Sequence, residues 1–339
     1  MRSASAALLA AFLLPLPVTA NAQAPSPSPR PFTLEVDVDV VSVTAVVFDK
    51  SGRFIPGLGP PDVTVFEDGV PQEVSYFKEA SGPGEKIPLS VALVLDASGS
   101  MKTNLRFLQE AATTFVRKLE EIDTALVISF NESIKGSAEF TGDIDRLEQF
   151  VEGLQAWGGT SLNDAIHYAL NRIRDQPGRK AIIVFSDGAD TTSSLKEQEV
   201  VDYARAVEAT VYSVGIRGGS GLMGRSPRGF LRKISSETGG AFFFPDRVSD
   251  LIEVFTEISH ELHNHYLLAY TPKRPPDGSF RRIEVRLDRK DAEVRVRKGY
   301  FAVKRRRPPA TGSGGLGATA PEEERPDSLR AFRVLSAPR

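Results

Sequence analysis

The sequence predicts an α/β fold, namely a doubly wound, Rossmann-like and mainly parallel sheet that is flanked by a small β module. Two observations lead to this prediction. Between residues 88 and 264, short β-branched runs alternate with amphipathic helical patterns, as in open parallel sheets covered by helices on both sides. Before and after that region, apolar residues recur with a period of two, which is typical of half-buried strands.

The chain begins with the pattern of a cleaved signal peptide, residues 1–22. Arg2 precedes an apolar run from Ala4 to Val18, and Ala20-Asn21-Ala22 has the small-x-small form of a cleavage site. The run is shorter than the roughly 20 residues that a membrane span needs, so no transmembrane segment is expected. We therefore expect an exported protein, periplasmic or extracellular. Residues 23–31 alternate proline with small or polar residues and are predicted to be a linker.

Residues 32–80 are predicted to form an N-terminal β segment. Apolar residues alternate from Leu34 to Val47, with a change of phase at Val40-Val41 that indicates a bulge or a strand changing its buried face. Shorter strands are predicted at Val63 to Glu67 and Val74 to Phe77, with a turn at Glu67-Asp68-Gly69 between them.

Residues 88–264 are predicted to form the α/β domain. Its strands are largely apolar on both faces, as strands between helices must be: Ser90 to Leu95, Ala125 to Ser129, Lys180 to Phe185 and Thr210 to Gly215. Its helices show apolar stripes at three-and-four spacing. These stripes are Leu105, Leu108, Ala112, Phe115, Val116 and Leu119; Ala165, Ile166, Ala169, Leu170 and Ile173; and Leu251, Val254, Phe255, Ile258 and Leu262.

Residues 265–303 return to period-two patterns, at Tyr266 to Tyr270, Arg281 to Leu287 and Val294 to Val296. Since strands rarely stand alone, we expect this C-terminal β segment to pair with the N-terminal one in a single β module. Residues 304–339 contain basic, proline, glycine and acidic clusters without sustained periodicity and are predicted to be a disordered tail.

Composition argues against several classes of function. Lys plus Arg number 42 and Asp plus Glu number 44, a net charge of −2, so binding of nucleic acid through a broad basic surface is not expected. The sequence has no cysteine, which excludes disulfides, thiolate nucleophiles and cysteine-ligated metals, and it has only four histidines. Oxygen ligands are abundant instead, and they suit hard cations such as magnesium or calcium.

Polar side chains follow two predicted parallel strands at their carboxyl ends, where doubly wound sheets bind ligands. Asp96-Ala97-Ser98-Gly99-Ser100 follows one strand, and Ser186-Asp187-Gly188 follows another. Between them, Trp157-Gly158-Gly159-Thr160-Ser161 is predicted to be a glycine-hinged loop that presents the Thr160 hydroxyl. Ser98 and Ser100 are expected to point the same way, because Gly99 allows a tight turn between them.

This combination resembles the von Willebrand factor A domain and its metal-ion-dependent adhesion site. The family pattern is D-x-S-x-S, a threonine on a later loop and an aspartate after the fourth strand. All five positions are filled here, by Asp96, Ser98, Ser100, Thr160 and Asp187. The resemblance implies a sheet with strand order 3-2-1-4-5-6, in which the first and fourth strands are neighbours and bring the two aspartates to one crevice.

The whole chain is also similar to exported bacterial proteins described as von Willebrand factor A-related, in which β segments flank the A domain. Val65-Phe66-Glu67-Asp68-Gly69 and Tyr266-Leu267-Leu268-Ala269-Tyr270-Thr271-Pro272 match that arrangement.

The resemblance also implies how a cation is held. Ser98 and Ser100 bind it directly, Thr160 directly or through water, and the two aspartates largely through water. Magnesium prefers six oxygens and keeps several waters, which fits this set, and calcium or manganese would also fit. An exposed sixth position then accepts an Asp or Glu carboxylate from a protein partner, as in the family.

Two other motifs indicate different ligands but lack the context these ligands need. Residues 219–224 match G-x-G-x-x-G, but they follow a late strand instead of the first βα turn of a dinucleotide site. Three histidines form an H-x-x-H-x-H run without the H-E-x-x-H arrangement of zinc hydrolases, so we interpret them as a polar helix end: His260, His263 and His265.

A serine hydrolase is not predicted either. Neither G-x-S-x-G nor S-x-x-K occurs around Ser98, and His167 is expected to face away from the ligand loop. Trp157, the only tryptophan, is either an aromatic that contacts a partner or a side chain packed under its loop.

The sequence therefore predicts an exported, non-enzymatic protein-binding module that depends on a divalent cation. One alternative is a metal-dependent periplasmic hydrolase, for which the sequence offers only aspartates as general base. Another is a structural subunit of an envelope assembly that pairs through its β segments. The partner's identity and the oligomeric state follow from no motif.

Overall fold

The computed structural model describes residues 40–82, 86–187, 190–216 and 228–303. The predicted signal peptide, linker and tail, residues 34–39 of the alternating run that begins at Leu34, and the glycine motif at 219–224 lie outside the described residues. In the described part of the chain, no helix has both the length and the apolar character that a bilayer crossing requires.

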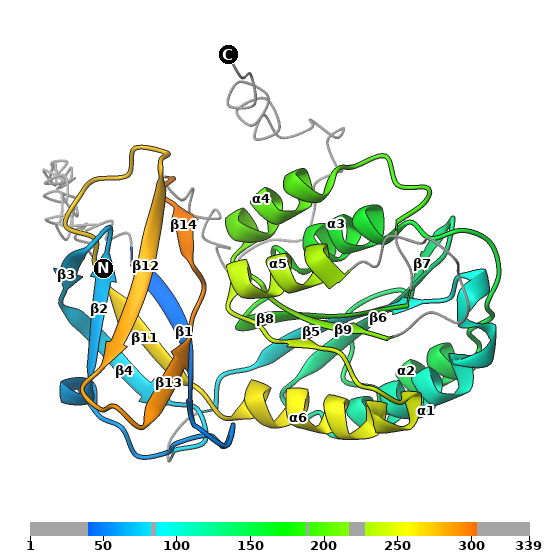
Figure 1. Ribbon diagram of the computed structural model, residues 1–339, viewed down its shortest axis with the longest axis horizontal. Helices are drawn as coiled ribbons and strands as arrows, with labels where there is room; N and C mark the ends of the chain where they lie inside the picture. The colour runs from blue at the N-terminus through cyan, green and yellow to red at the C-terminus, as the bar shows by residue number, and fades with distance from the viewer. Residues whose placement is uncertain (1–39, 83–85, 188–189, 217–227, 304–339) are drawn as a thin grey trace, which may run out of the picture. The chain divides into compact units, whose positions relative to one another are not determined.

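A six-stranded sheet forms the centre of the α/β domain (Figure 1). Its order is β10-β9-β8-β5-β6-β7, and all neighbours are parallel except β7, which runs antiparallel to β6. This confirms the predicted topology, with β5 and β8 adjacent. The strands are β5 (Leu89–Asp96), β6 (Thr124–Phe130), β7 (Ile134–Gly136), β8 (Arg179–Ser186), β9 (Thr210–Gly215) and β10 (Phe242–Phe243).

Helices cover both faces of this sheet, as predicted (Figure 1). One face carries α1 (Leu105–Val116), α2 (Ile144–Glu152) and α6 (Leu251–His263), and the other carries α3 (Leu162–Ile173), α4 (Glu197–Val207) and α5 (Arg228–Thr238). Each set packs its apolar stripe against alternate residues of the strands, so the domain has two hydrophobic cores separated by the sheet. The predicted stripe of α1 is slightly too long, because that helix ends at Val116 and Leu119 lies beyond it.

Two four-stranded antiparallel sheets form a β-sandwich from the two flanking segments. Their orders are β13-β1-β11-β4 and β14-β12-β2-β3, so each sheet mixes strands from before and after the α/β domain. This confirms that the N-terminal and C-terminal segments pair in one module. The strands are β1 (Val41–Asp49), β2 (Val63–Glu67), β3 (Val70–Gln72), β4 (Val74–Glu79), β11 (Tyr266–Tyr270), β12 (Phe280–Leu287), β13 (Ala292–Arg295) and β14 (Gly299–Phe301).

The predicted turn between the first short strands is present and connects β2 to β3. Asp68 has φ 48° and Gly69 has φ 81°, both in the left-handed region that such tight hairpins use. Three short 3-10 helices complete the described fold: η1 (Pro60–Asp62), η2 (Gly99–Thr103) and η3 (Val248–Asp250).

Candidate metal centre

The loop after β5 and the loop before α3 approach each other closely at the carboxyl edge of the sheet. The Gly99 amide donates a hydrogen bond to the Gly158 carbonyl at 3.0 Å, and the Trp157 amide donates to the Ala97 carbonyl at 2.9 Å. A Cβ atom at position 99 would lie 3.2 Å from the Gly158 oxygen. Glycine at position 99 therefore permits this contact between the loops, in addition to the tight turn expected from the sequence.

Four of the five predicted site residues form one connected polar cluster. The Ser98 and Ser100 hydroxyl oxygens lie 3.0 Å apart, and the Ser100 hydroxyl donates to Oδ1 of Asp187 at 2.7 Å. Asp96 accepts from the Ser98 amide through Oδ1 at 2.8 Å and from the Ser186 hydroxyl through Oδ2 at 2.6 Å. Because β5 and β8 are paired neighbours, residues 91 positions apart in the sequence reach the same place.

Thr160 lies on the adjoining loop. Its amide donates to the Thr191 hydroxyl at 2.9 Å, and its carbonyl accepts from the Thr191 amide at 2.8 Å. The next residue, Ser161, donates its amide to the Asn131 carbonyl at 2.8 Å. No hydrogen bond of the described region joins the Thr160 side chain to the other four residues, so its position beside them rests on the two backbone contacts between the loops.

The two carboxylates are buried without a neutralising cation. Asp96 is completely buried and Asp187 is 6% exposed, and neither pairs with a Lys, Arg or His of the described chain. Burial raises the pKa of Asp96 to about 6, and the nearby charge of Asp187 adds to this shift. Burial also raises the pKa of Asp187. Two desolvated carboxylates close together destabilise the folded protein electrostatically, and a bound cation would remove this destabilisation.

The donor set fits a hard divalent cation. Oδ2 of Asp187 is buried and has no hydrogen-bond partner among the described residues, and such an orphaned acceptor calls for an ion or water. The hydroxyls of Ser98 and Ser100 adjoin it, so all nearby donors are oxygens, as magnesium requires. Within the described ranges there is no group of three His, Cys, Asp or Glu side chains arranged for a metal. A metal here would therefore rely on the hydroxyls.

Sequence reasoning missed the residues that position this cluster. The Ser186 hydroxyl donates a hydrogen bond directly to Asp96, although the sequence motif distinguishes Ser186 only as the residue before Asp187. Thr191 holds Thr160 by both its amide and its hydroxyl, at a separation of 31 residues. The polar run Asp190-Thr191-Thr192-Ser193-Ser194 was the available signal for it.

The histidines take no part in this cluster. The His167 ring packs in a tilted arrangement against Tyr203 on α4, with ring centroids 4.8 Å apart, so it faces away from the ligand loop as predicted. His263 ends α6 and bonds Asp123 at 3.2 Å, whereas His265 is buried beyond the helix. The interpretation of all three histidines as a polar helix end is therefore wrong for His265.

Trp157 is 44% exposed on the loop that contacts residues 97 and 99. It is therefore not packed under its loop, which was one of the two expectations. A large aromatic side chain open to solvent beside the polar cluster is suited to contact with another molecule.

Residues 90–257 match the family model of the von Willebrand factor type A domain. Over 227 residues the chain is 24% identical to inter-alpha-trypsin inhibitor heavy chain H4 of Homo sapiens. The match covers 61% of this chain and 24% of that protein. It is 23% identical over 180 residues to an uncharacterized protein of Borreliella burgdorferi, covering 45% of this chain and 52% of that protein. The chain thus spans from about a quarter to about half of the length of these curated relatives.

Solved structures with similar folds include a von Willebrand factor type A protein from Catenulispora acidiphila, at 13% identity and a TM-score of 0.47, covering 76% of this chain and 72% of that one. The vWF domain of the type V pili tip protein Mfa5 from Porphyromonas gingivalis has 15% identity and a TM-score of 0.43, and the match covers 53% of this chain and 96% of that one. A proximal thread matrix protein from the mussel byssus, with zinc in its MIDAS motif, has 14% identity and a TM-score of 0.45, and the match covers 54% of this chain and 47% of that one.

Proposed function

Because residues 90–257 belong to the von Willebrand factor type A domain family, we propose that this protein is an exported, cation-dependent protein-binding module. Its cation, magnesium in the first place, is held by five residues, and an Asp or Glu of a protein partner completes the coordination shell. The five residues are Asp96, Ser98, Ser100, Thr160 and Asp187.

The single observation that carries this proposal is the uncompensated carboxylate pair. Asp96 and Asp187 are both buried, and one oxygen of Asp187 has no partner in the described chain. A structural role alone would favour neutral side chains at these positions, since unpaired buried charge is destabilising. A divalent cation would neutralise the two carboxylates and so remove this destabilisation, which explains why charged side chains stand at these positions.

The hydroxyls determine what the bound cation can do. Ser98 and Ser100 contribute neutral oxygens, so the ion keeps most of its charge and attracts a further carboxylate. Trp157, exposed on the neighbouring loop, offers an apolar surface next to that carboxylate. Protein recognition through one ion and a nearby aromatic group needs no broad charged face.

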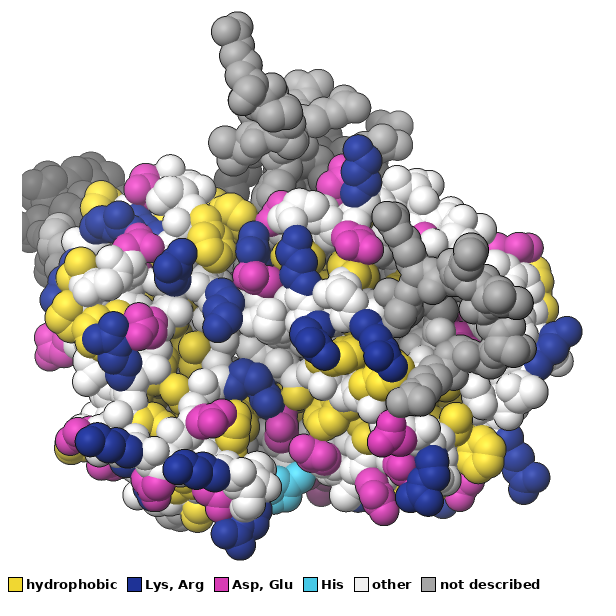
Figure 2. Space-filling model, viewed as in Figure 1, with side chains coloured by type: hydrophobic (Ala, Val, Ile, Leu, Met, Phe, Trp, Pro, Cys, Tyr) yellow, Lys and Arg dark blue, Asp and Glu magenta, His cyan; other side chains and the backbone are white. Residues whose placement is uncertain are grey.

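The distribution of surface charge is consistent with this mode of binding. On the face seen in Figure 2, Lys and Arg side chains are interspersed with Asp and Glu instead of gathered into one basic patch. Because the net charge is −2, we do not propose that the protein binds nucleic acid or an anionic membrane through general electrostatic attraction. Export rests on the signal-peptide pattern of residues 1–22.

The first test measures metal binding directly. Magnesium, manganese, calcium and zinc are titrated into the metal-free protein by isothermal titration calorimetry. We expect saturable binding at one site, which Asp96→Ala and Ser98→Ala abolish and which Asp145→Ala, an exposed carboxylate on α2, leaves unchanged. Circular dichroism confirms that each variant is folded. Metal binding that persists in folded Asp96→Ala would refute the site.

The second test concerns the partner. Immobilised protein is exposed to an envelope extract of the producing cells with magnesium or with chelator, and Asp96→Ala is treated in parallel. We expect a partner that is retained only by the wild type with magnesium. A partner that is retained equally with chelator and by Asp96→Ala would instead support a structural subunit. Turnover of phosphate or ester substrates would support a hydrolase.

A further inference from the structure

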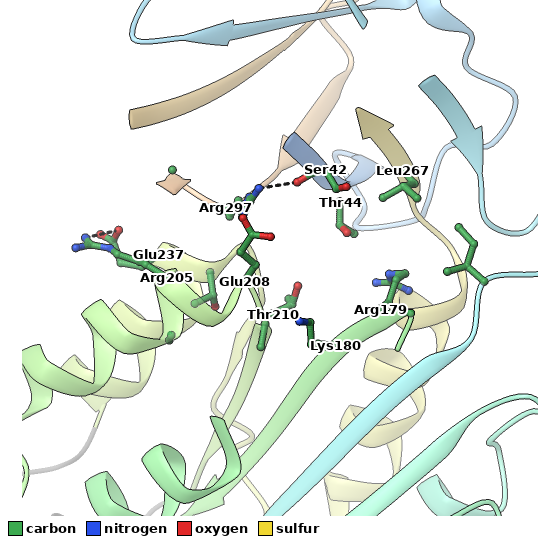
Figure 3. A pocket seen from close by; sticks show the side chains of 16 residues that line it. Ser42, Thr44, Arg179, Lys180, Arg205, Glu208, Thr210, Glu237, Leu267 and Arg297 are labelled. Carbon is green, nitrogen blue, oxygen red and sulfur yellow. Dashed lines mark hydrogen bonds and ion pairs between the residues drawn. The ribbon is translucent and has the colours of Figure 1, made fainter. Parts of the chain in front are cut away.

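Two connections join the β-sandwich to the α/β domain, and they meet at one junction. One leads from β4 to β5, and the other leads from the end of α6 into β11. The Ala80 amide of the first donates a hydrogen bond to the His265 carbonyl of the second at 2.9 Å. A neighbouring cavity of about 310 Å³ shows the same junction, because Arg179 of β8 and Leu267 of β11 both line it (Figure 3). A change at His265 therefore acts on both connections together.

The His265 side chain is buried at this junction without a hydrogen-bond partner. It is 2% exposed, and neither Nδ1 nor Nε2 has a partner among the described residues. A neutral imidazole has one donor and one acceptor, and buried groups of this kind are normally paired. Since both nitrogens are closed off from solvent, His265 can take up a proton only when the junction opens.

A cavity of about 240 Å³ adjoins His265, and charged groups from four segments line it. They are Lys86 before β5, Glu120 and Asp123 between α1 and β6, Arg179 at the start of β8 and His263 at the end of α6. Both carboxylates are already engaged. Glu120 pairs with Lys86 at 2.7 Å. Asp123 bonds His263 at 3.2 Å and also attracts Arg179.

The closed junction disfavours a protonated His265 for two physical reasons. Burial removes the water that a charged imidazole needs, and the positive charges of Arg179 and His263 repel it. The Leu262 carbonyl opposes this effect, but it already accepts a hydrogen bond from Arg179. The pKa of His265 is therefore well below the ordinary value of 6.5, to which it returns when the ring is exposed to water.

We propose that this junction is an acid-sensitive latch, closed at neutral pH and opened when His265 takes up a proton. Opening moves the ring away from Arg179 and His263 into water. It also breaks the hydrogen bond between Ala80 and His265, so the β-sandwich and the α/β domain separate at their connections. Histidine is suited to such a switch because its ordinary pKa lies within the physiological range.

The direction of the pH dependence follows from the lowered pKa of His265. The closed form binds fewer protons than the open form, so its stability is complete above about pH 6.5 and is lost as the pH falls below that value. His263 acts in the opposite direction, because its hydrogen bond to Asp123 raises its pKa and its proton stabilises the closed form. Only the proton on His265 opens the latch.

The latch is independent of the candidate metal centre. Arg179 begins β8 and Ser186 ends it, so the two lie at opposite ends of one strand, roughly 23 Å apart at about 3.3 Å per residue. The latch can therefore be tested with a metal chelator present, and failure of one proposal leaves the other intact.

The experiment follows hydrogen–deuterium exchange of the full chain between pH 7.5 and 5.0, with rates corrected for the intrinsic effect of pH. Peptides that contain Ala80 or His265 report on the junction, and peptides from β5 report on the interior of the α/β domain. Uptake of one proton favours opening up to about tenfold per pH unit below about 6.5. We expect exchange at the junction to rise roughly 10- to 30-fold, with no comparable rise in β5.

Variants assign this change to the buried ring. In His265→Leu, which cannot titrate, exchange at the junction should change by less than about twofold over the same range. His260→Gln, which replaces an exposed histidine on α6, should behave as the wild type does. His265→Gln is the second non-titrating variant if His265→Leu does not fold.

Three results overturn the proposal. The first is wild-type exchange at the junction that does not rise on acidification, and the second is an equal rise in β5. The third is a folded His265→Leu or His265→Gln that retains the wild-type dependence on pH. The wild-type comparison of the junction with β5 decides whether acid opens the junction even without the variants.

Discussion

The β-sandwich contains a buried ion pair whose removal gives a sharp test of what stabilises the module. Arg281 is completely buried, and its Nη1 donates to Oε1 of Glu67 at 3.1 Å. The other oxygen of Glu67 accepts from the Tyr270 and Tyr300 hydroxyls at 2.9 and 2.8 Å. Since Glu67 lies on β2 while the other three residues follow the α/β domain, this network joins the two ends of the described chain.

The substitution Glu67→Gln retains the shape of the side chain and removes its charge. Leaving one partner of a buried pair without its counter-charge costs about 3–5 kcal/mol. Arg281 retains Asp277 at 3.4 Å and two backbone carbonyls, which favours the lower end, near 3 kcal/mol. If the described region unfolds as one unit, this corresponds to a fall in melting temperature of roughly 6–12 °C.

The assay combines scanning calorimetry with urea unfolding followed by circular dichroism, which reports on both parts of the fold. Trp157, the only tryptophan, reports on the α/β domain alone, so its fluorescence shows whether the sandwich unfolds separately. The matched control is Glu293→Gln, an exposed glutamate on β13, which should stay within about 0.5 kcal/mol of the wild type. A Glu67→Gln protein as stable as that control would refute the reasoning.

Three further predictions follow from other parts of the structure. In chelator, Asp187→Asn should be as stable as the wild type or more stable, because it removes a buried charge; with magnesium the order should reverse, since only the wild type gains binding energy, as melting temperatures will show. The hydrogen bond to Asp123 raises the pKa of His263, so the stability that the protonated His263 contributes is complete below about pH 6.5 and is lost as the pH rises through the raised pKa. Urea unfolding should therefore show that the stability lost in His263→Gln becomes smaller between about pH 5.5 and 8.5. Gly178→Ala should destabilise by more than about 2 kcal/mol, because φ is 71° and a Cβ would lie 2.2 Å from a backbone oxygen, whereas Gly229→Ala on α5 has open space and should be neutral or stabilising.

The four inner strands of the central sheet were predictable because they are almost uniformly buried, whereas the short edge strands β7 and β10 were not predicted. All eight residues of β5 are buried, and its residues 91–95 appear in the sequence as one continuous apolar run. The elements that were missed have weak local signals. The helix α2 buries only Leu147 and Val151, β14 has three residues, and β3 contains Pro71, which argues against a strand but is tolerated at the sheet edge where β3 lies.

The candidate site was predictable as far as its chemistry lies in short motifs at strand ends. The strand order then placed Asp96 and Asp187 together, as expected from the resemblance. What the sequence did not indicate is the support around them. Thr191 reaches Thr160 across 31 residues through tertiary packing, and a serine next to a predicted ligand carries no sign that it faces Asp96 from a neighbouring strand.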